Sequence, residues 1–409
     1  MTQEYDAIVL GSGPSGATAA MYLKKIYGKN VVLVDKAKFP RDKICGDAQG
    51  RKAANIMKEL GIHDDYTKLE GHVVYGITLS SPNGALVELD VEDRKNPAPG
   101  YVHKRIVFDR YLHESAKKMG VTMKMLNATD LIIENETVCG IVGLNEKGEK
   151  EEIRAKITLA ADGASSMVAR KFGLSDNPKE DFIVAVRAYY TGVTGMTDRI
   201  EIHMVESLLP GYFWIFPLPN GEANVGLGMI VKDMEEKKIN LRESMVKEIE
   251  KNPLFAGRFK NAKLEGEIKG WSLPIASYHR KCYGNGFMLL GDAAGLIDPL
   301  SGEGVGTAMI SAKHAAKAAS DAIDKDDCSE HFLKRYDKDL WDEIGPEIKA
   351  NDRLQKLGKK HPDLIDKLVM KAAKDESFRK MIEKMLPYTG GRHEMGQLSF
   401  VEKLKLLTI

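Results

Sequence analysis

The stretch YDAIVLGSGPSGATAAMYLKKIYG, Tyr5 to Gly28, decides the fold of this chain. Its apolar start, YDAIVL, predicts a buried strand, and a helical pattern follows the glycine-rich turn GSGPSG. A second apolar run, VVLVD, predicts another strand that ends in Asp35, 19 residues after Gly16. A strand, a glycine turn, a helix and a strand closed by an acid are the parts of a Rossmann-type nucleotide site.

Each glycine of this turn has its own predicted role. Gly11 permits the tight turn, Gly13 lets the backbone approach a pyrophosphate, and Gly16 lets helix and strand pack closely. The helix start offers free N–H groups to phosphate, and Asp35 can accept hydrogen bonds from ribose hydroxyls. The motif alone does not separate FAD from NAD, but its place near the start of a long chain favours FAD. The residues assigned to this site are Gly11, Gly13, Pro14, Ser15, Gly16, Asp35 and Lys36.

Composition excludes several classes of protein. With 409 residues, the chain is long enough for two or three domains. The 60 basic and 59 acidic residues balance to a net charge of +1, which gives no electrostatic reason to expect nucleic acid. No window approaches the ~18 apolar residues of a membrane-spanning helix. The start of the chain does not resemble a signal peptide, the four cysteines are dispersed, and no metal-ligand cluster is present. We therefore expect a cytoplasmic protein without a metal.

Two later motifs repeat the pattern of a strand followed by glycine and aspartate. In AKITLAADGASSMVARKFG a strand runs into Asp162 and Gly163. In GNGFMLLGDAAG a strand runs into Gly291 and Asp292, and the loop PLSGEGVG leads to a helix rich in alanine. Such small residues predict that this helix packs closely against backbone or a flat group.

The order GSGPSG, ADG and GDAAG resembles FAD-dependent enzymes of the para-hydroxybenzoate hydroxylase-like superfamily. The resemblance implies that Asp292 binds the ribityl chain or pyrophosphate and that Asp162 and Gly163 support the pyrophosphate region. It also implies that Arg110 reaches the FAD phosphates, and that the helix beginning near Gly304 points its N-terminus at the flavin N1–C2=O edge, where it would stabilise negative charge. The local alternatives are an Asx turn for Asp162 and a solvated helix position for Arg110. The late motif contributes Gly291, Asp292, Pro299, Gly302, Gly304, Val305 and Gly306.

The segment KICGDA, Lys43 to Ala48, resembles the geranylgeranyl reductase branch of that superfamily, in which a K-x-C-G pattern recurs. The resemblance implies that Cys45, Gly46, Asp47 and Ala48 lie at the isoalloxazine ring. Positive charge nearby would favour the reactive form of the thiol, so Cys45 is the candidate catalytic residue. The alternative is a small, inert side chain packed beside the ring.

An aromatic strand is predicted in GYFWIFPLPNGEANVGLGM, Gly211 to Met229. Tyr212, Trp214 and Phe216 alternate and therefore share one face of the strand. Pro217 ends the strand, and the Asn-Gly pair that follows predicts a hairpin.

The returning strand carries Gly226 and Gly228, which we expect to clear space beside the aromatic face. The whole pattern resembles the substrate-binding signature of geranylgeranyl reductases. A prenyl chain without polar groups must bind by burial, worth about 0.8 kcal/mol per CH₂. The alternative interpretation is ordinary sheet core.

Together these features predict an α/β fold with three parts. A Rossmann-type FAD-binding domain takes residues 1–70, 103–180 and 272–329; a strand-rich substrate domain takes 71–102 and 181–271. Residues 330–409 are expected to form a C-terminal helical domain. Its tail, VEKLKLLTI, is mildly amphipathic and suits either a peripheral membrane contact or a solvated helix.

The resemblance implies an FAD-dependent reductase that saturates prenyl double bonds of isoprenoid lipids, above all digeranylgeranylglycerol phospholipids. Geranylgeranyl diphosphate, menaquinone side chains and prenylated chlorophyll precursors are the alternative substrates. Hydride would come from flavin N5, and the proton from Cys45 or an ordered water. There is no second complete GxGxxG motif, so NAD(P)H and a ferredoxin-like protein are both candidates for the electron donor.

Two rival functions share the same motifs. One is a flavin monooxygenase or halogenase, because FWIFP is similar to the W-x-W-x-I-P strand of flavin halogenases. The other is an isoprenoid-binding flavoprotein without turnover. The KICGDA segment argues against the first rival, and the intact loop from Pro299 to Gly306 argues against the second.

Overall fold

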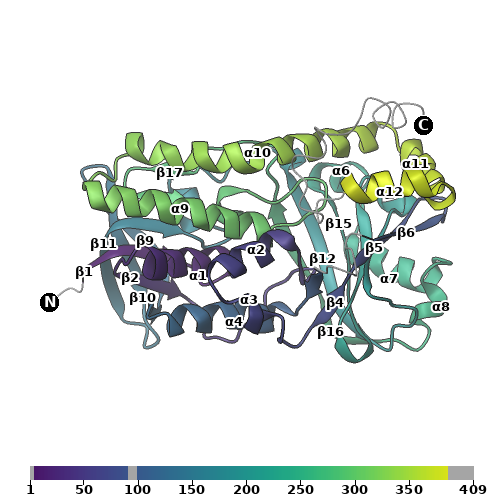
Figure 1. Ribbon diagram of the computed structural model, residues 1–409, viewed down its shortest axis with the longest axis horizontal. Helices are drawn as coiled ribbons and strands as arrows, with labels where there is room; N and C mark the ends of the chain where they lie inside the picture. The colour runs from purple at the N-terminus through teal and green to yellow at the C-terminus, as the bar shows by residue number, and fades with distance from the viewer. Residues whose placement is uncertain (1–3, 91–98, 386–409) are drawn as a thin grey trace.

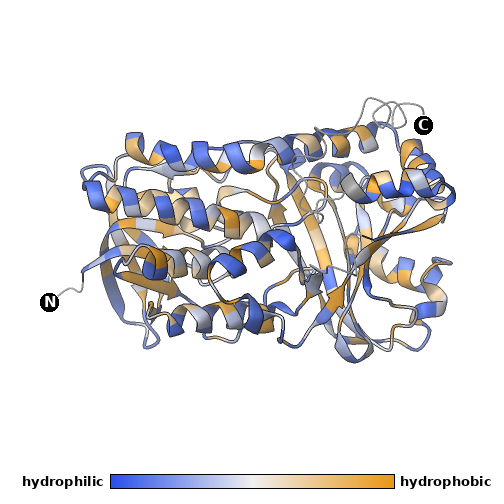
Figure 2. Ribbon diagram, viewed as in Figure 1, coloured by the Kyte–Doolittle hydropathy of each residue, from blue (hydrophilic) through white to orange (hydrophobic). Residues whose placement is uncertain are grey.

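The computed structural model of the chain describes residues 4–90 and 99–385. Two large sheets lie toward opposite ends of the long axis, and helices cover them (Figure 1). Figure 2 shows apolar residues gathered on the strands between these helices. The α/β fold class predicted from the sequence is confirmed.

The first sheet is the nucleotide-binding one and has eight strands among the described residues. Five neighbouring strands run parallel, and their apolar runs are buried as in other parallel sheets. In spatial order these are β8 (Thr122–Met125), β2 (Val31–Asp35), β1 (Glu4–Leu10), β11 (Lys150–Ala160) and β18 (Phe287–Leu289). The antiparallel strands are β9 (Asn127–Glu134), β10 (Thr137–Leu144) and β17 (Tyr283–Gly284).

Helices with small side chains pack on this sheet. Helix α1 (Pro14–Met21) is buried along its whole length between its neighbours α4 (Arg105–Lys118) and α9 (Val305–Lys325), and it continues as a π-helical turn, η1 (Tyr22–Ile26). Proline at the first position of α1 suits a helix start, where no N–H partner is lost. The remaining elements here are α2 (Arg51–Glu59), α3 (His63–Tyr66), α5 (Met167–Lys171) and a small sheet of β3 (Ala48–Gln49), β4 (His72–Val74) and β7 (Gly100–Val102).

The second sheet has seven strands among the described residues, in the order β16, β12, β15, β14, β13, β5, β6. Parallel pairing of β5 with β13 joins two chain segments separated by more than a hundred residues. One face packs on α7 (Leu241–Lys251) and α8 (Ala256–Phe259), and the other turns toward the first sheet. The strands are β5 (Gly76–Ser80), β6 (Leu86–Asp90), β12 (Phe182–Thr191), β13 (Arg199–His203), β14 (Tyr212–Pro217), β15 (Glu222–Ile230) and β16 (Lys263–Pro274).

The C-terminal part of the described chain is helical. Helix α10 (Glu330–Lys360) lies along α9 and extends past it to α6 (Val231–Glu236), where Lys359 pairs with Asp233 at 2.6 Å (Figure 1). Helices α11 (Asp363–Lys374) and α12 (Glu376–Met385) pack on β6. The VEKLKLLTI tail lies outside the described residues. Among the described helices, none is long and apolar enough to cross a membrane. The three domain ranges stay a prediction.

Candidate active site

The three glycine-containing motifs meet at the carboxyl ends of adjacent parallel strands. Strand β11 lies between β1 and β18, so the motifs that follow these strands become neighbours. Gly11 has a φ of +101°, and a Cβ added there would lie 2.3 Å from the Ala161 carbonyl oxygen. A Cβ added at Gly291 would lie 3.1 Å from Ser15 Oγ. The contact at Gly11 excludes a side chain, and the left-handed backbone of Gly291, with a φ of +56°, disfavours one there. The first motif therefore packs directly on the second and third.

The remaining glycines divide into packed and open positions. A Cβ at Gly16 would lie 1.7 Å from the Gly11 carbonyl oxygen, so this glycine is needed for α1 to approach β1. At Gly13 the nearest atom would be Arg41 Nη2 at 3.6 Å, and at Gly163 no atom lies within 4 Å. The backbone at Gly13 and Gly163 is therefore accessible to a bound group.

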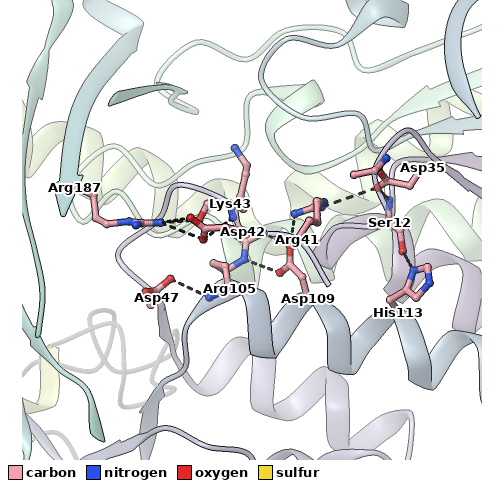
Figure 3. A network of polar contacts seen from close by, with 11 residues as sticks. Ser12, Asp35, Arg41, Asp42, Lys43, Asp47, Arg105, Asp109, His113 and Arg187 are labelled. Atoms are coloured by element: carbon pink, nitrogen blue, oxygen red, sulfur yellow. Dashed lines mark hydrogen bonds and ion pairs between the residues drawn. The ribbon is translucent and has the colours of Figure 1, made fainter. Parts of the chain in front are cut away.

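Asp35 closes the glycine turn from β2. Its carboxylate accepts hydrogen bonds from the backbone N–H groups of Ser12 at 2.7 Å and Ala37 at 2.8 Å. Arg41 Nη2 lies 4.0 Å away (Figure 3). Each carboxylate oxygen accepts one backbone bond here and has a second lone pair for a ribose hydroxyl. Lys36, beside it, is exposed.

The two later aspartates differ in their surroundings. Asp162 accepts the Met167 backbone N–H at 2.7 Å through Oδ2, whereas its Oδ1 is buried without a hydrogen-bond partner in the described structure. Burial raises the pKa of Asp162. Asp292 is half-buried, in the 3₁₀ turn η5 (Gly291–Ala294), with Oδ1 3.7 Å from the position of a Cβ on Gly304. The unpartnered Asp162 oxygen could accept a hydrogen bond, and the accessible backbone at Gly13 and Gly163 could approach phosphate. Both features fit the polar groups of a dinucleotide such as FAD.

The arginine of α4 that is buried in this region is Arg105, and the contact of Arg110 with the FAD phosphates stays a prediction. Arg110 is exposed on the same outer side of α4 as Ile106. Arg105 is buried and bonds Asp109 through two nitrogens, at 2.6 and 2.9 Å. Arg41 Nη1 bonds the same carboxylate at 2.9 Å (Figure 3). Five residues separate the two arginines, so they project from different sides of the helix.

The segment that carries Cys45 lies between the two sheets. Before it, Asp42 pairs with the buried Arg187 of β12 at 3.2 Å (Figure 3). The ammonium of Lys43 lies 3.6 Å from the centre of the Trp271 ring, and burial lowers the pKa of Lys43 to about 8. Cys45 itself is half-buried, and the positive charge of the Arg105 guanidinium lies near it. A thiolate at Cys45 would therefore have a cationic neighbour.

Asp47 is the polar centre of this junction. It has a left-handed backbone, with φ 67°, and its side chain is fully buried. Oδ2 accepts the Tyr189 hydroxyl at 2.7 Å and Asn224 Nδ2 at 2.8 Å, and Oδ1 accepts the Arg105 backbone N–H at 3.2 Å. Burial raises the pKa of Asp47 to about 6, against the lowering effect of Arg187. One carboxylate thus joins β12, β15 and α4 to the cysteine segment.

The aromatic face of β14 packs on the same segment. Trp214 Nε1 donates to Asn224 Oδ1 at 2.9 Å, and Asn224 Nδ2 donates to the Cys45 carbonyl at 2.8 Å. A Cβ on Gly46 would lie 3.0 Å from Phe216 Cε2. The Tyr212 hydroxyl donates to the Ser301 carbonyl at 2.6 Å. The aromatic strand therefore contacts both the cysteine segment and the loop before α9.

The predicted hairpin and shared face are confirmed, but the role expected for one glycine is wrong. Strands β14 and β15 pair antiparallel, with Trp214 opposite Gly226 and Tyr212 opposite Gly228. A Cβ on Gly226 would lie 2.2 Å from Trp214 Cζ2, so the indole ring fills the space that this glycine leaves. At Gly228 the nearest atom would be Ala185 Cβ at 3.3 Å. Pro217, buried at the end of β14, pairs with Ala223.

The start of α9 is not as free as the sequence suggested. The half-buried Glu303 side chain accepts the Gly306 backbone N–H, and Lys52 of α2 lies against both residues. Glu303 therefore offsets part of the positive end of the helix. Val305 is buried, and Gly302 has a φ of 69°, with a Cβ position 3.1 Å from the Tyr212 hydroxyl.

Several functional candidates were missed because their partners are distant in sequence. Arg105 and Asp109 form an i, i+4 pair that inspection of the helix would have found. The others had no local signal. They are Arg41, Lys52, Arg187, Tyr189 and Asn224. Glu303 was missed although its hydrogen-bond partner, Gly306, is only three residues away.

Comparison with known proteins places this arrangement in a family. A family model described as FAD binding domain matches residues 4–340. Digeranylgeranylglycerophospholipid reductase 1 of Methanococcoides burtonii is 33% identical over 93% of this chain and 90% of its own length. The enzyme of that name from Methanopyrus kandleri is 33% identical over 83% of this chain and 86% of its own.

Solved structures show the same fold. A geranylgeranyl bacteriochlorophyll reductase-like protein from Thermoplasma acidophilum superposes with a TM-score of 0.80, 26% identity and coverage of 99% of this chain and 96% of that one. A flavin-dependent brominase has a TM-score of 0.72 and 22% identity, over 94% and 99% of the two chains, a likeness of fold alone. This chain belongs to the FAD binding domain family and, within it, to the family of the digeranylgeranylglycerophospholipid reductases.

Proposed function

We propose that this protein is an FAD-dependent reductase that saturates C=C double bonds in the geranylgeranyl chains of isoprenoid lipids. The substrates we propose are digeranylgeranylglycerol phospholipids, because the curated relatives that cover most of the chain carry that name. The observation that carries the proposal is the contact of the cysteine segment with the aromatic face of β14 through Asn224.

This contact brings a reactive side chain next to an apolar surface. Trp214 and Phe216 are almost fully buried, Cys45 is half-buried, and the two regions share a hydrogen-bonded junction at Asn224. An isoprenoid chain has no polar group to orient it, so its double bonds can be placed only by shape and burial. We assign this placement of the double bonds to the aromatic side chains that contact the cysteine segment.

Reduced FAD, when bound, supplies the hydride that one carbon of the double bond receives. For the second carbon we assign Cys45 as the proton donor, with an ordered water as the alternative. Loss of the thiol proton leaves a sulfur anion near the Arg105 guanidinium until a solvent proton returns. Hydride and proton together add two hydrogens to each double bond.

The test is an anaerobic single-turnover experiment. The purified flavoprotein is reduced with dithionite and mixed with a digeranylgeranylglycerol phospholipid, and flavin absorbance and lipid mass are followed together. We expect flavin reoxidation with a gain of two hydrogens per double bond. A flavin that is reoxidised only by oxygen, with unchanged lipid mass, would contradict the reductase and favour the monooxygenase.

The Cys45→Ala variant tests the proton donor within the same experiment. We expect a reoxidation rate lowered about 100-fold, as for loss of a general acid. Cys139→Ala is the matched control, because Cys139 is also half-buried but lies on β10, away from this junction. Equal rates for wild type and Cys45→Ala would assign the proton to water.

The natural electron donor and the membrane contact belong to the same proposal. We propose NAD(P)H or a ferredoxin-like protein as donor, to be distinguished by the rate at which each reduces the flavin in stopped-flow mixing. A lipid substrate also suggests peripheral attachment to the bilayer, which co-sedimentation with archaeal-type lipid vesicles tests.

A further inference from the structure

One side of α10 contacts α2 and the loop that precedes α9. Glu347, Asn351 and Gln355 are four residues apart and therefore share one side of the helix. Glu347 pairs with Lys52 at 2.7 Å, Asn351 Nδ2 donates to Asp298 Oδ2 at 2.6 Å, and Gln355 Nε2 donates to the Pro299 carbonyl at 2.9 Å. Two of these contacts reach the loop that precedes α9.

Asp298 organises that loop from inside. Its Oδ1 accepts three hydrogen bonds, from Leu300 N at 3.0 Å, Ser301 N at 2.8 Å and Ser301 Oγ at 2.8 Å. Its Oδ2 is left for Asn351, and both side chains are buried, with 2% and 6% exposure. A buried carboxylate oxygen without a partner is costly, so the Asn351 amide decides whether Asp298 is fully satisfied.

The same loop contacts the rest of the site. Ser301 accepts the Tyr212 hydroxyl at 2.6 Å from the aromatic strand, and Glu303 caps the start of α9. Backbone bonds from Asp298 N to the Glu303 carbonyl at 2.9 Å and from Gly302 N to the Asp298 carbonyl at 3.0 Å close the loop on itself. A displacement of Asp298 would therefore also move the contact of the loop with Tyr212 and the start of α9.

We propose that Asn351 is a positioning residue, which holds the 298–303 loop through Asp298 in the shape that binds the flavin and completes the substrate surface. The inference builds on the proposed function, but its structural step concerns this chain alone. It gives α10 a role in the active site, although Asn351 lies nearly fifty residues beyond the loop in sequence.

Exchange of the two side chains tests the proposal. In Asn351→Asp two carboxylates face each other, and we expect FAD to bind about tenfold or more weakly to the apoprotein, with faster hydrogen exchange in residues 298–303. In the double variant Asp298→Asn/Asn351→Asp, the amide oxygen at position 298 still accepts the three loop bonds, and its nitrogen donates to the new carboxylate. We expect this double variant to recover FAD affinity and exchange protection.

The controls separate positioning from stability and from the proposed chemistry. Arg353→Ala alters an exposed residue of α10 and is expected to leave affinity and loop exchange unchanged. A double variant as weak as Asn351→Asp would overturn the inference, since the charge of Asp298 and not the hydrogen bond would then matter. Unchanged affinity and exchange in Asn351→Asp would overturn it as well. Both measurements use FAD without lipid, so a failure of prenyl reduction in the wild type would leave them interpretable.

Discussion

The glycine turn before α1 and the junction around Asp47 hold the two sides of the same site in different ways. The turn is made of backbone and of glycines that lie within six residues of each other, and its closest contacts are carbonyl oxygens. The junction is made of side chains from β12, β15 and α4, joined at one buried carboxylate. The turn tolerates no added atom at Gly11 or Gly16, whereas the junction depends on charge and on the placement of each hydrogen-bond donor.

This difference follows from what each region must do. A phosphate-binding turn needs backbone close to the ligand, which only glycine allows. A junction between two sheets must place a reactive loop against an apolar surface, and buried polar groups do this only when each has a partner. Substitutions in the turn should therefore destabilise the protein by adding atoms where there is no space. Substitutions in the junction should destabilise it by leaving buried polar groups without hydrogen-bond partners.

The largest effect is expected for Gly16→Ala. The new methyl group would lie 1.7 Å from the Gly11 carbonyl oxygen, so α1 must move away from β1. We expect a loss of more than about 4 kcal/mol in the free energy of unfolding and purification without flavin absorbance. Gly257→Ala is the matched control, since no atom lies within 4 Å of its added Cβ. A yellow, stable Gly16→Ala protein would contradict the packing argument.

Arg105→Ala should be the next most severe change. It removes the two hydrogen bonds to the buried Asp109 and leaves that carboxylate with Arg41 alone. We expect a loss of about 3 kcal/mol in urea unfolding, as for other broken buried ion pairs. Arg110→Ala on the exposed side of the same helix should stay within about 0.5 kcal/mol of wild type. Equal losses of unfolding free energy for Arg105→Ala and Arg110→Ala would contradict the structural difference between the buried and the exposed side of α4.

Asp47 makes stability depend on pH in a predictable direction. The pKa of its carboxyl is raised from 3.8 to about 6 in the folded protein, so between these values the folded state holds a proton that the unfolded state releases. Stability from this group is therefore present below pH 4 and is lost as pH rises toward 6, by about 3 kcal/mol.

Asp47→Asn isolates that effect, because asparagine also tolerates the left-handed backbone but does not titrate. Between pH 4 and pH 7, wild type should lose about 3 kcal/mol relative to the variant in urea unfolding. Parallel pH profiles for the two proteins would show that Asp47 is ionised at its ordinary pKa.

A smaller effect is expected for Gly226→Ala on β15. Its methyl group would lie 2.2 Å from Trp214 Cζ2, and overpacking of this kind costs about 1–3 kcal/mol. Trp214→Phe removes the ring atoms in conflict but not the Val186 carbonyl oxygen, which lies 2.3 Å from the added Cβ, so the double variant should recover only part of the loss and still be more stable than the sum of the single changes predicts. Strict additivity in thermal unfolding would mean that the ring does not fill this space.

The nucleotide half of the site was largely predictable because its signals are local. Strands β1 and β2, helix α1 and the hairpin of β14 and β15 lie where their patterns place them. The cysteine segment was recognised by resemblance, but its partners were not. Arg110 was chosen and Arg105 was overlooked because the motif predicts a helix but does not show which side of that helix is buried.

The sequence by itself determined the α/β class, the glycine turn and the shared face of Tyr212, Trp214 and Phe216, because periodicity and backbone sterics act over a few residues. Only the tertiary structure decided that Trp214 fills the space at Gly226, that Arg187 pairs with Asp42 and that Asn351 reaches Asp298. Those contacts join residues from different elements, and their geometry depends on how the two sheets and α10 pack together. Short-range patterns carry no information about such distances.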